Sequence, residues 1–144
     1  MNIREIENCI INKLQQNFSN FQVAGFPEKP QEYVLLHPTG AILVRYCGGS
    51  YSSSDSIGYI SQDKKMEFGV TVVTRNLRSN CGTYETLEKV KTVLSGYKIL
   101  GCSKLMPTKE NFISEQNGIW QYEILFTLTT PSVAIPVEIA RSVL

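Results

Sequence analysis

Apolar residues near the start of the chain recur at steps of three and four, the spacing of one face of a helix. Charged and amide side chains fill the positions between them, so residues 3–17 are predicted to form an amphipathic helix. The same spacing returns after Thr83, which is placed as the N-cap of a second helix that Gly96 closes. Each helix has one apolar stripe and must pack it against a sheet. The stripes comprise Ile3, Ile6, Cys9, Ile10, Leu14 and Phe18, and Tyr84, Leu87, Val90, Val93 and Leu94.

The residues between the two helices alternate between apolar and polar, which is the period of a β-strand. A short strand is predicted at 21–26, ended by Pro27, and extended structure resumes at 32–37. Two longer runs are predicted to pair as a long hairpin: one covers residues 40–46 and the other starts at Met66.

Three β-type segments follow the second helix, at 98–107, 111–118 and 119–130. The dipeptide Asn-Gly at 117 and 118 predicts a tight turn between the last two. The last strand alternates strongly and is predicted to end at Pro131, with one face in the core and the other in water. The core face comprises Trp120, Tyr122, Ile124, Phe126 and Leu128, and the solvent face Gln121, Glu123, Thr127 and Thr129.

These elements predict an α+β fold. We expect an antiparallel sheet with two helices packed on one face, a two-layer sandwich with a long projecting hairpin loop. A chain of 144 residues with 42% hydrophobic content can bury one core. Residues 1–130 are therefore assigned to a single domain and residues 131–144 to a C-terminal tail.

The charge of the chain favours no class of charged partner. Its 14 Lys and Arg residues against 13 Asp and Glu give a formal net charge of +1, which exerts no overall attraction on nucleic acid or an acidic membrane. The longest apolar runs are short, and no basic segment followed by an apolar stretch opens the chain. We therefore expect neither an export signal nor a membrane span, and a protein made in the cytosol.

The cysteines do not predict a metal site. Cys9, Cys47, Cys81 and Cys102 are far apart, and His37 is the only histidine. Zinc sites use close cysteine pairs together with histidines, so we expect no metal and no cofactor. In a reducing compartment four such thiols pack as small apolar side chains.

The stretch CGGSYSSSDSIGY at 47–59 is the one candidate for chemistry. It lacks the lysine of a phosphate-binding loop and lies between strands, where no helix N-terminus favours an anion. An enzyme hypothesis would use a serine from 52–54 with His37 as its base, but His37 precedes a proline turn and no G-x-S-x-G elbow is present. The acidic residues read as solvated surface, and we expect no catalytic residue.

A polar loop of about a dozen residues, 49–62, is longer than a hairpin connection needs, and long loops often serve contacts. Basic residues near the hairpin suggest a charged rim, although they also serve solubility. The predicted contact residues are Tyr51, Ser52, Ser53, Ser54, Asp55, Tyr59, Arg75 and Arg78.

The order of these segments resembles a known family, the Mu-like phage tail terminators or tail-completion proteins, with a fold like the lambda tail terminator. The residues that carry the resemblance run from about 3 to 130. They are IREIENCIINKL, GAILVRYCGGSY with its polar loop, FGVTVVTRNLR, GTYETLEKVKTVLSGY and WQYEILFTL.

The resemblance implies a virion protein of the phage tail and neck, assembled in the host cytoplasm, and not an enzyme. It implies a homo-hexameric ring that caps the tail tube, stops its polymerisation and gives the head connector or neck protein a docking surface. The tube protein is an implied partner and the sheath protein a further candidate, while DNA passes through the lumen without sequence-specific binding. Another neck or baseplate adaptor is the alternative. A head-to-tail ring also agrees with a one-sided sheet, because each copy can cover the edge strands of the next.

Overall fold

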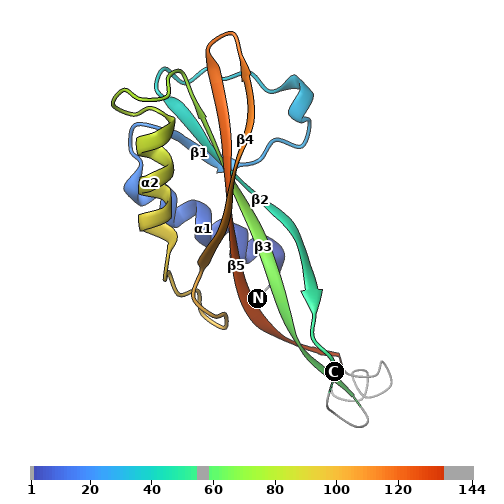
Figure 1. Ribbon diagram of the computed structural model, residues 1–144. Coiled ribbons are helices and arrows are strands. Elements are labelled where there is room, and N and C mark those ends of the chain that lie inside the picture. Colours follow the sequence, from blue (N-terminus) through green and yellow to red (C-terminus); the bar gives the residue numbers. More distant parts are fainter. Residues whose placement is uncertain (1, 55–58, 135–144) are drawn as a thin grey trace.

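The computed structural model describes residues 2–54 and 59–134. In this part of the chain two helices and one five-stranded sheet form an α+β fold that does not close into a barrel (Figure 1). The elements, in chain order, are α1 (Ile3–Asn17), β1 (Gln22–Gly25), the short 3₁₀ helix η1 (Pro30–Glu32), β2 (Gly40–Tyr51), β3 (Ile60–Thr74), α2 (Thr83–Leu94), β4 (Met106–Gln116) and β5 (Ile119–Ala134).

The strands lie in the order β1-β2-β3-β5-β4. The last four pair antiparallel as predicted, but β1 pairs parallel to β2, from Gln22 opposite Ala41 to Gly25 opposite Val44, so the sheet is mixed. The parallel pair arises because the chain runs back along the sheet between β1 and β2. Residues 32–37, predicted as extended, belong to this return and form no strand.

Both helices cover one face of the sheet, which confirms the predicted two-layer arrangement (Figure 1). The stripe residues Ile6, Ile10 and Leu14 of α1 meet those of α2 over the middle strands, β2, β3 and β5. Alternate residues of these strands complete the core, as the period-two pattern requires. They are Ile42, Val44, Met66, Phe68, Val70, Val72, Ile124, Phe126 and Leu128.

The helix ends agree with the sequence except at one cap. Gly82, and not Thr83, is the N-cap of α2. The Thr83 hydroxyl is instead buried and hydrogen-bonded to Thr74 Oγ1 at 2.5 Å, and it also donates to the Asn76 carbonyl. Gly96 follows the last turn with a φ of 80°, as predicted for the residue after the C-cap.

Four strands extend beyond their predicted bounds. β2 continues from Tyr46 to Tyr51, and β4 begins at Met106, before the predicted residue 111. The other two are β3 and β5. β3 begins at Ile60, six residues before Met66, and β5 continues past Pro131 to Ala134. Each extension pairs with the other, from Ile60 opposite Ala134 to Lys65 opposite Thr129, so cross-strand pairing overrides the polar composition. Pro131 is tolerated because β4 pairs with β5 only as far as Thr127, which leaves Pro131 in an edge segment. Of the predicted tail, residues 135–144 lie outside the described residues.

The segment at 98–107 is not the strand that the sequence predicted. It is a loop joined by an isolated bridge between Lys98 and Lys104, and only its last two residues enter β4. The loop is anchored by Ile99, Cys102 and Leu105, which are buried in the core. Its alternating appearance therefore comes from three anchoring side chains and not from a regular strand.

The face of the sheet away from the helices is less exposed than predicted. Ala41, Leu43 and Val73 form a small second core there, covered by Phe26, Tyr33 and Leu35 from the segment before β2. Glu123, which was predicted to face water, is 6% exposed, and Thr127 is equally buried. On the helix side Trp120 and Tyr122, predicted for the core, are only partly buried because they lie towards the end of β5 that α2 does not fully cover.

Candidate interaction surface

Three strands run beyond the helices and form a projecting ribbon, here called the arm (Figure 1). The arm consists of residues 48–54 from β2 and its end, 59–65 from the start of β3, and 129–134 from β5. Its strands remain paired throughout, from Gly48 opposite Glu67 to Ile60 opposite Ala134. Of the predicted loop at 49–62, residues 49–51 belong to β2 and 60–62 to β3, so strand structure reaches into both ends of it.

The serines at the tip bond to the neighbouring strand. Ser52 donates its backbone N–H to the Asp63 carbonyl at 2.8 Å, and its Oγ accepts from the Asp63 N–H at 2.8 Å. Ser54 Oγ accepts from the N–H of Ser61 at 3.0 Å. These serines thus extend the pairing of β2 and β3. Asp55, another predicted contact residue, lies outside the described residues.

Large apolar side chains are exposed on the arm, which is unusual for a surface that meets only water. Tyr51 and Val133 are each 56% exposed, Ile60 51% and Tyr59 49%. Tyr51 and Tyr59 were both predicted as contact residues, and the structure places them at the same end of the molecule. Ser53, also predicted, is exposed beside them.

Lys64 holds the helix-side surface of the arm together. Its Nζ lies 5.5 Å from the ring centroid of Tyr46 and 5.4 Å from that of Tyr51, within the range of cation–π attraction. Partial burial opposes the charge, but hydrogen bonding to Tyr51 and to Tyr46 outweighs it and raises the pKa of Lys64. Lys64 is therefore a positive charge held at a fixed place between two aromatic rings.

Arg75 and Arg78 do not join the other predicted contact residues. They follow β3 at the end opposite the arm, about 50 Å away at 3.3 Å per strand residue. Arg75 donates to the carbonyls of Leu35, His37 and Pro38, so it holds the return segment in place. Arg78 lies over the ring of Tyr84 at 5.6 Å.

The two edges of the sheet differ. Helix α1 lies against β1, and Gln15 Nε2 donates to the Val23 carbonyl at 3.1 Å. At the other edge β4 pairs with β5 on one side only, and among the described residues no strand covers its outer side. Most β4 side chains are exposed, including Met106 at 59%, Phe112 at 55% and Ile113 at 48%. An uncovered edge of this length readily pairs with another chain.

Aromatic rings gather beside β4 on the helix side of the sheet. Phe112 packs on Tyr122 with ring centroids 5.4 Å apart and on Trp120 at 6.3 Å, and Tyr84 meets Tyr122 edge-on at 6.5 Å. The sequence placed Tyr84 in the apolar stripe of the second helix, but its side chain is 44% exposed, and the sequence did not single out Phe112. Their grouping depends on the pairing of β4 with β5 and on the docking of α2.

A charged pair lies on the other face of the sheet. Arg45 donates through Nε and Nη2 to Glu123 Oε2, at 3.2 and 2.8 Å. Burial opposes the charge of Arg45, but the hydrogen bond to Glu123 outweighs it and raises the pKa of the guanidinium. Gly69 leaves room for this pair, since a Cβ there would lie 2.6 Å from Glu123 Oε2. The pair anchors strands β2 and β5 across β3.

Cys47 lies near this pair and is not an activated nucleophile. Burial raises the pKa of its thiol, the carboxylates of Glu123 and Glu67 raise it further, and Arg45 only partly offsets them. A reactive cysteine needs the opposite shift. All four cysteines are free, but only Cys102 is fully buried, so the predicted apolar packing holds most clearly there.

The structure keeps His37 and the serines of 52–54 apart. They flank the two ends of β2, whose twelve residues span about 40 Å. His37 Nδ1 accepts from the N–H of Thr39 at 3.2 Å, which is the turn role expected before a proline. In residues 2–54 and 59–134, moreover, no three His, Cys, Asp or Glu side chains are grouped to hold a metal ion.

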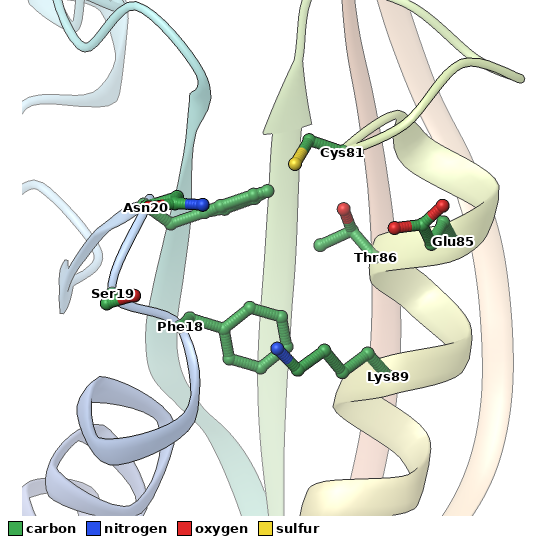
Figure 2. A pocket seen from close by; sticks show the side chains of 8 residues that line it. Phe18, Ser19, Asn20, Cys81, Glu85, Thr86 and Lys89 are labelled. Carbon is green, nitrogen blue, oxygen red and sulfur yellow. The ribbon is translucent and has the colours of Figure 1, made fainter.

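A small cavity of about 80 Å³ lies between the end of α1 and the start of α2 (Figure 2). Its lining includes the ring of Phe18, and Lys89 Nζ lies 4.6 Å from the centroid of that ring. The sulfur of Cys81 points towards the cavity. Pockets that bury a drug-sized ligand are several times larger. This cavity is therefore a weaker functional candidate than the exposed surfaces of the arm and β4.

The sequence matches the Gp37 family, described as Gp37 protein, over residues 10–140. The chain belongs to the Gp37 family. This membership indicates a phage-derived protein and agrees with the broader part of the resemblance drawn from the sequence. No curated protein matches the chain. Among the residues described, no helix of this Gp37 protein is long and apolar enough to cross a membrane.

Proposed function

We propose that this Gp37 protein is a structural component of a phage tail, a tail terminator that forms a ring on the end of the tail tube. The ring stops polymerisation of the tube and offers a surface on which the head connector docks. In this proposal the protein acts in the virion, after assembly in the host cytoplasm, and catalyses no reaction.

The observation that carries the proposal is the placement of the exposed apolar residues. Met106, Phe112 and Ile113 lie on the uncovered edge of β4, and Tyr51, Tyr59, Ile60 and Val133 lie on the arm, so exposed apolar side chains gather on two different surfaces of the sheet, while Val34, Leu36 and Leu100 are exposed elsewhere. A subunit of a cyclic assembly needs two different contact surfaces, one for each neighbour. The membership of the Gp37 family supports the phage context.

The proposal assigns partners by surface. Copies of the chain meet each other through the sides of the sheet, and the tube or sheath protein and the neck protein contact the two rims of the ring. The six-fold stoichiometry rests on the resemblance to tail terminators. DNA passes through the lumen without sequence-specific binding, which agrees with a formal net charge of +1.

Electron microscopy of particles made without this protein tests the function. We expect tails of abnormal length and heads without tails, both restored when the intact gene is supplied in trans. Joined particles with tails of normal length would refute the proposal. Labelling the protein in complete particles separates this role from that of another neck or baseplate adaptor, because a terminator label lies between head and tail.

A further inference from the structure

Two strands of the sheet have uncovered edges on opposite sides. β4 is one of them. The other is β2 beyond Val44, because β1 ends at Gly25 and the last bond to that side of β2 is from the Phe26 N–H to the Val44 carbonyl, at 2.7 Å. Residues 45–51 of β2 therefore present unpaired backbone groups in the described part of the chain.

The directions of these strands suit one another. β4 and β3 both run antiparallel to β5, so they share a direction, and β2 runs antiparallel to β3. If a second copy is placed beside the first in the same orientation, β4 of one therefore runs antiparallel to β2 of the other. Antiparallel pairing is the more favourable ladder.

The side chains on the helix-side face of the two edges are complementary. On β4, Glu110 and Phe112 pair with Ile124 and Tyr122, which places both on the helix side. On the arm the same face carries Lys64, enclosed by two tyrosines. The one ion pair among the described residues joins other side chains, so neither Glu110 nor Lys64 has a partner of opposite charge there.

We propose that β4 of one copy docks antiparallel on residues 45–51 of the next copy, with Glu110 facing Lys64. The contact also covers Phe112 on one side and Tyr51 on the other, both more than half exposed in the single chain. The inference deepens the proposed function, since it specifies the subunit contact of the ring and rests on self-assembly.

The proposed contact requires a stagger between copies. Asn111 in the middle of β4 lies opposite Glu123, which pairs with Thr71, whereas Gly48 in the open part of β2 pairs with Glu67, four residues earlier in β3. Such an offset inclines the strands to the axis of a closed ring, as the strands of a closed barrel are inclined. The stagger therefore permits closure.

A charge exchange tests the contact. We expect Lys64→Glu and Glu110→Lys each to weaken self-association of the purified protein by about tenfold or more, and the double variant to recover most of the loss. Lys65→Glu is the matched control, because Lys65 follows Lys64 but lies on the opposite face and should have a much smaller effect. Sedimentation velocity over a range of concentrations measures the association.

Covalent trapping makes weak association visible. Tyr51 lies on β2, the strand that β4 would contact, and it is aligned through Lys64 with Thr130, whereas Glu110 is aligned with Ile124, six residues away on β5 and about 20 Å along the strand. A disulfide between residues 51 and 110 within one chain is therefore excluded. The variant Tyr51→Cys with Glu110→Cys should give a ladder of covalent oligomers on oxidation. The variant Ser50→Cys with Glu110→Cys, whose residue 50 lies on the opposite face, carries the same background of native cysteines and should not.

The results of these experiments test the proposed subunit contact and the proposed tail role separately. Equal effects at Lys64 and Lys65, or a chain that neither associates nor forms a ladder, would overturn the contact. A specific ladder and a charge rescue combined with normal, joined particles in the absence of the protein would support the contact and refute the tail role. Abnormal tails without the ladder would leave the tail role standing and refute the contact.

Discussion

At the scale of single residues, the pair Arg45 and Glu123 shows how a buried carboxylate is tolerated in this fold. Glu123 is 6% exposed, and both of its hydrogen bonds from Arg45 go to one oxygen. A buried charge without its partner is costly, because the folded protein cannot supply the solvation that water gave it. The stability of the middle of the sheet therefore depends on Arg45.

Replacing Arg45 with methionine should destabilise the fold by about 2 kcal/mol, less than the roughly 3–5 kcal/mol lost when a fully buried pair is broken, because Arg45 is partly exposed. Urea unfolding measures the free energy of unfolding. Combining Arg45→Met with Glu123→Gln removes the stranded charge and should recover part of the loss. If the double variant is as unstable as the sum of the two single variants, the pair does not act as a unit.

Glu7 should make the stability of the fold depend on pH. Burial raises the pKa of its carboxyl, and Arg4 offsets this only in part. The folded state therefore binds the proton more tightly than the unfolded state, so the contribution of Glu7 to stability falls as pH rises from the ordinary carboxyl pKa through the folded value.

The variant Glu7→Gln should be more stable than the wild type at pH 7, and its advantage should vanish near pH 3, where both states of Glu7 are protonated. Thermal unfolding at both pH values measures this difference. Glu5→Gln is the control on the same helix, because Glu5 is exposed and its substitution should bring no gain in stability at pH 7. An advantage of Glu7→Gln that grows as pH falls would contradict the burial account.

At the scale of elements, the turn between β4 and β5 is the clearest case of local sequence fixing local structure. Asn117 has a φ of 54° and Gly118 a φ of 79°, the two positive values that a two-residue turn with Asn-Gly requires. A Cβ on Gly118 would meet nothing within 4 Å, so only backbone strain opposes a side chain there.

We expect Gly118→Ala to cost roughly 1 kcal/mol, the penalty for an L-residue in the left-handed region. Gly118→Asn should cost less, since asparagine tolerates that region better than alanine does. Chemical denaturation of the two variants in parallel provides the comparison. Equal losses would show that the strain at this position is not conformational.

The sequence predicted both helices, their shared face, the Asn-Gly turn and the five strands that form, because these depend on residue periodicity and local turn chemistry. It also predicted extended structure at 32–37 and 98–107, where the structure has no regular strand apart from the start of β4. It did not predict the ends of β3 and β5, where polar residues such as Gln62 and Ser132 are held in strands by pairing across the sheet. Nor could it place Arg75 far from Tyr59. Their separation depends on the length of β3, which the polar composition at its start concealed.

At the scale of the whole molecule, the exposed tyrosines and aliphatic residues of the arm should contribute to assembly and only little to the stability of the single chain. The double variant Tyr51→Ser with Ile60→Ser should change the free energy of unfolding little, because both side chains are about half exposed. It should strongly reduce the fraction of joined particles when it replaces the wild-type protein in the phage, because the arm loses apolar contact area.

Leu36→Ser is the matched control for the arm. Leu36 is 83% exposed and lies in the return segment before β2, away from the arm. Electron microscopy counts joined particles for both variants, and urea unfolding confirms that both chains fold. Joined particles at the wild-type level with the arm variant would show that the arm is not a contact surface.

The unbroken course of β3 from the body into the arm also has a mechanical consequence. β3 is bonded on one side to β2 and on the other to β5 along nearly all of its fifteen residues, and these bonds lie across the strand direction. A tension applied to the tip therefore loads many of them in shear together, instead of peeling them one after another. A protein pulled at this end should resist extension far better than its helices alone would allow.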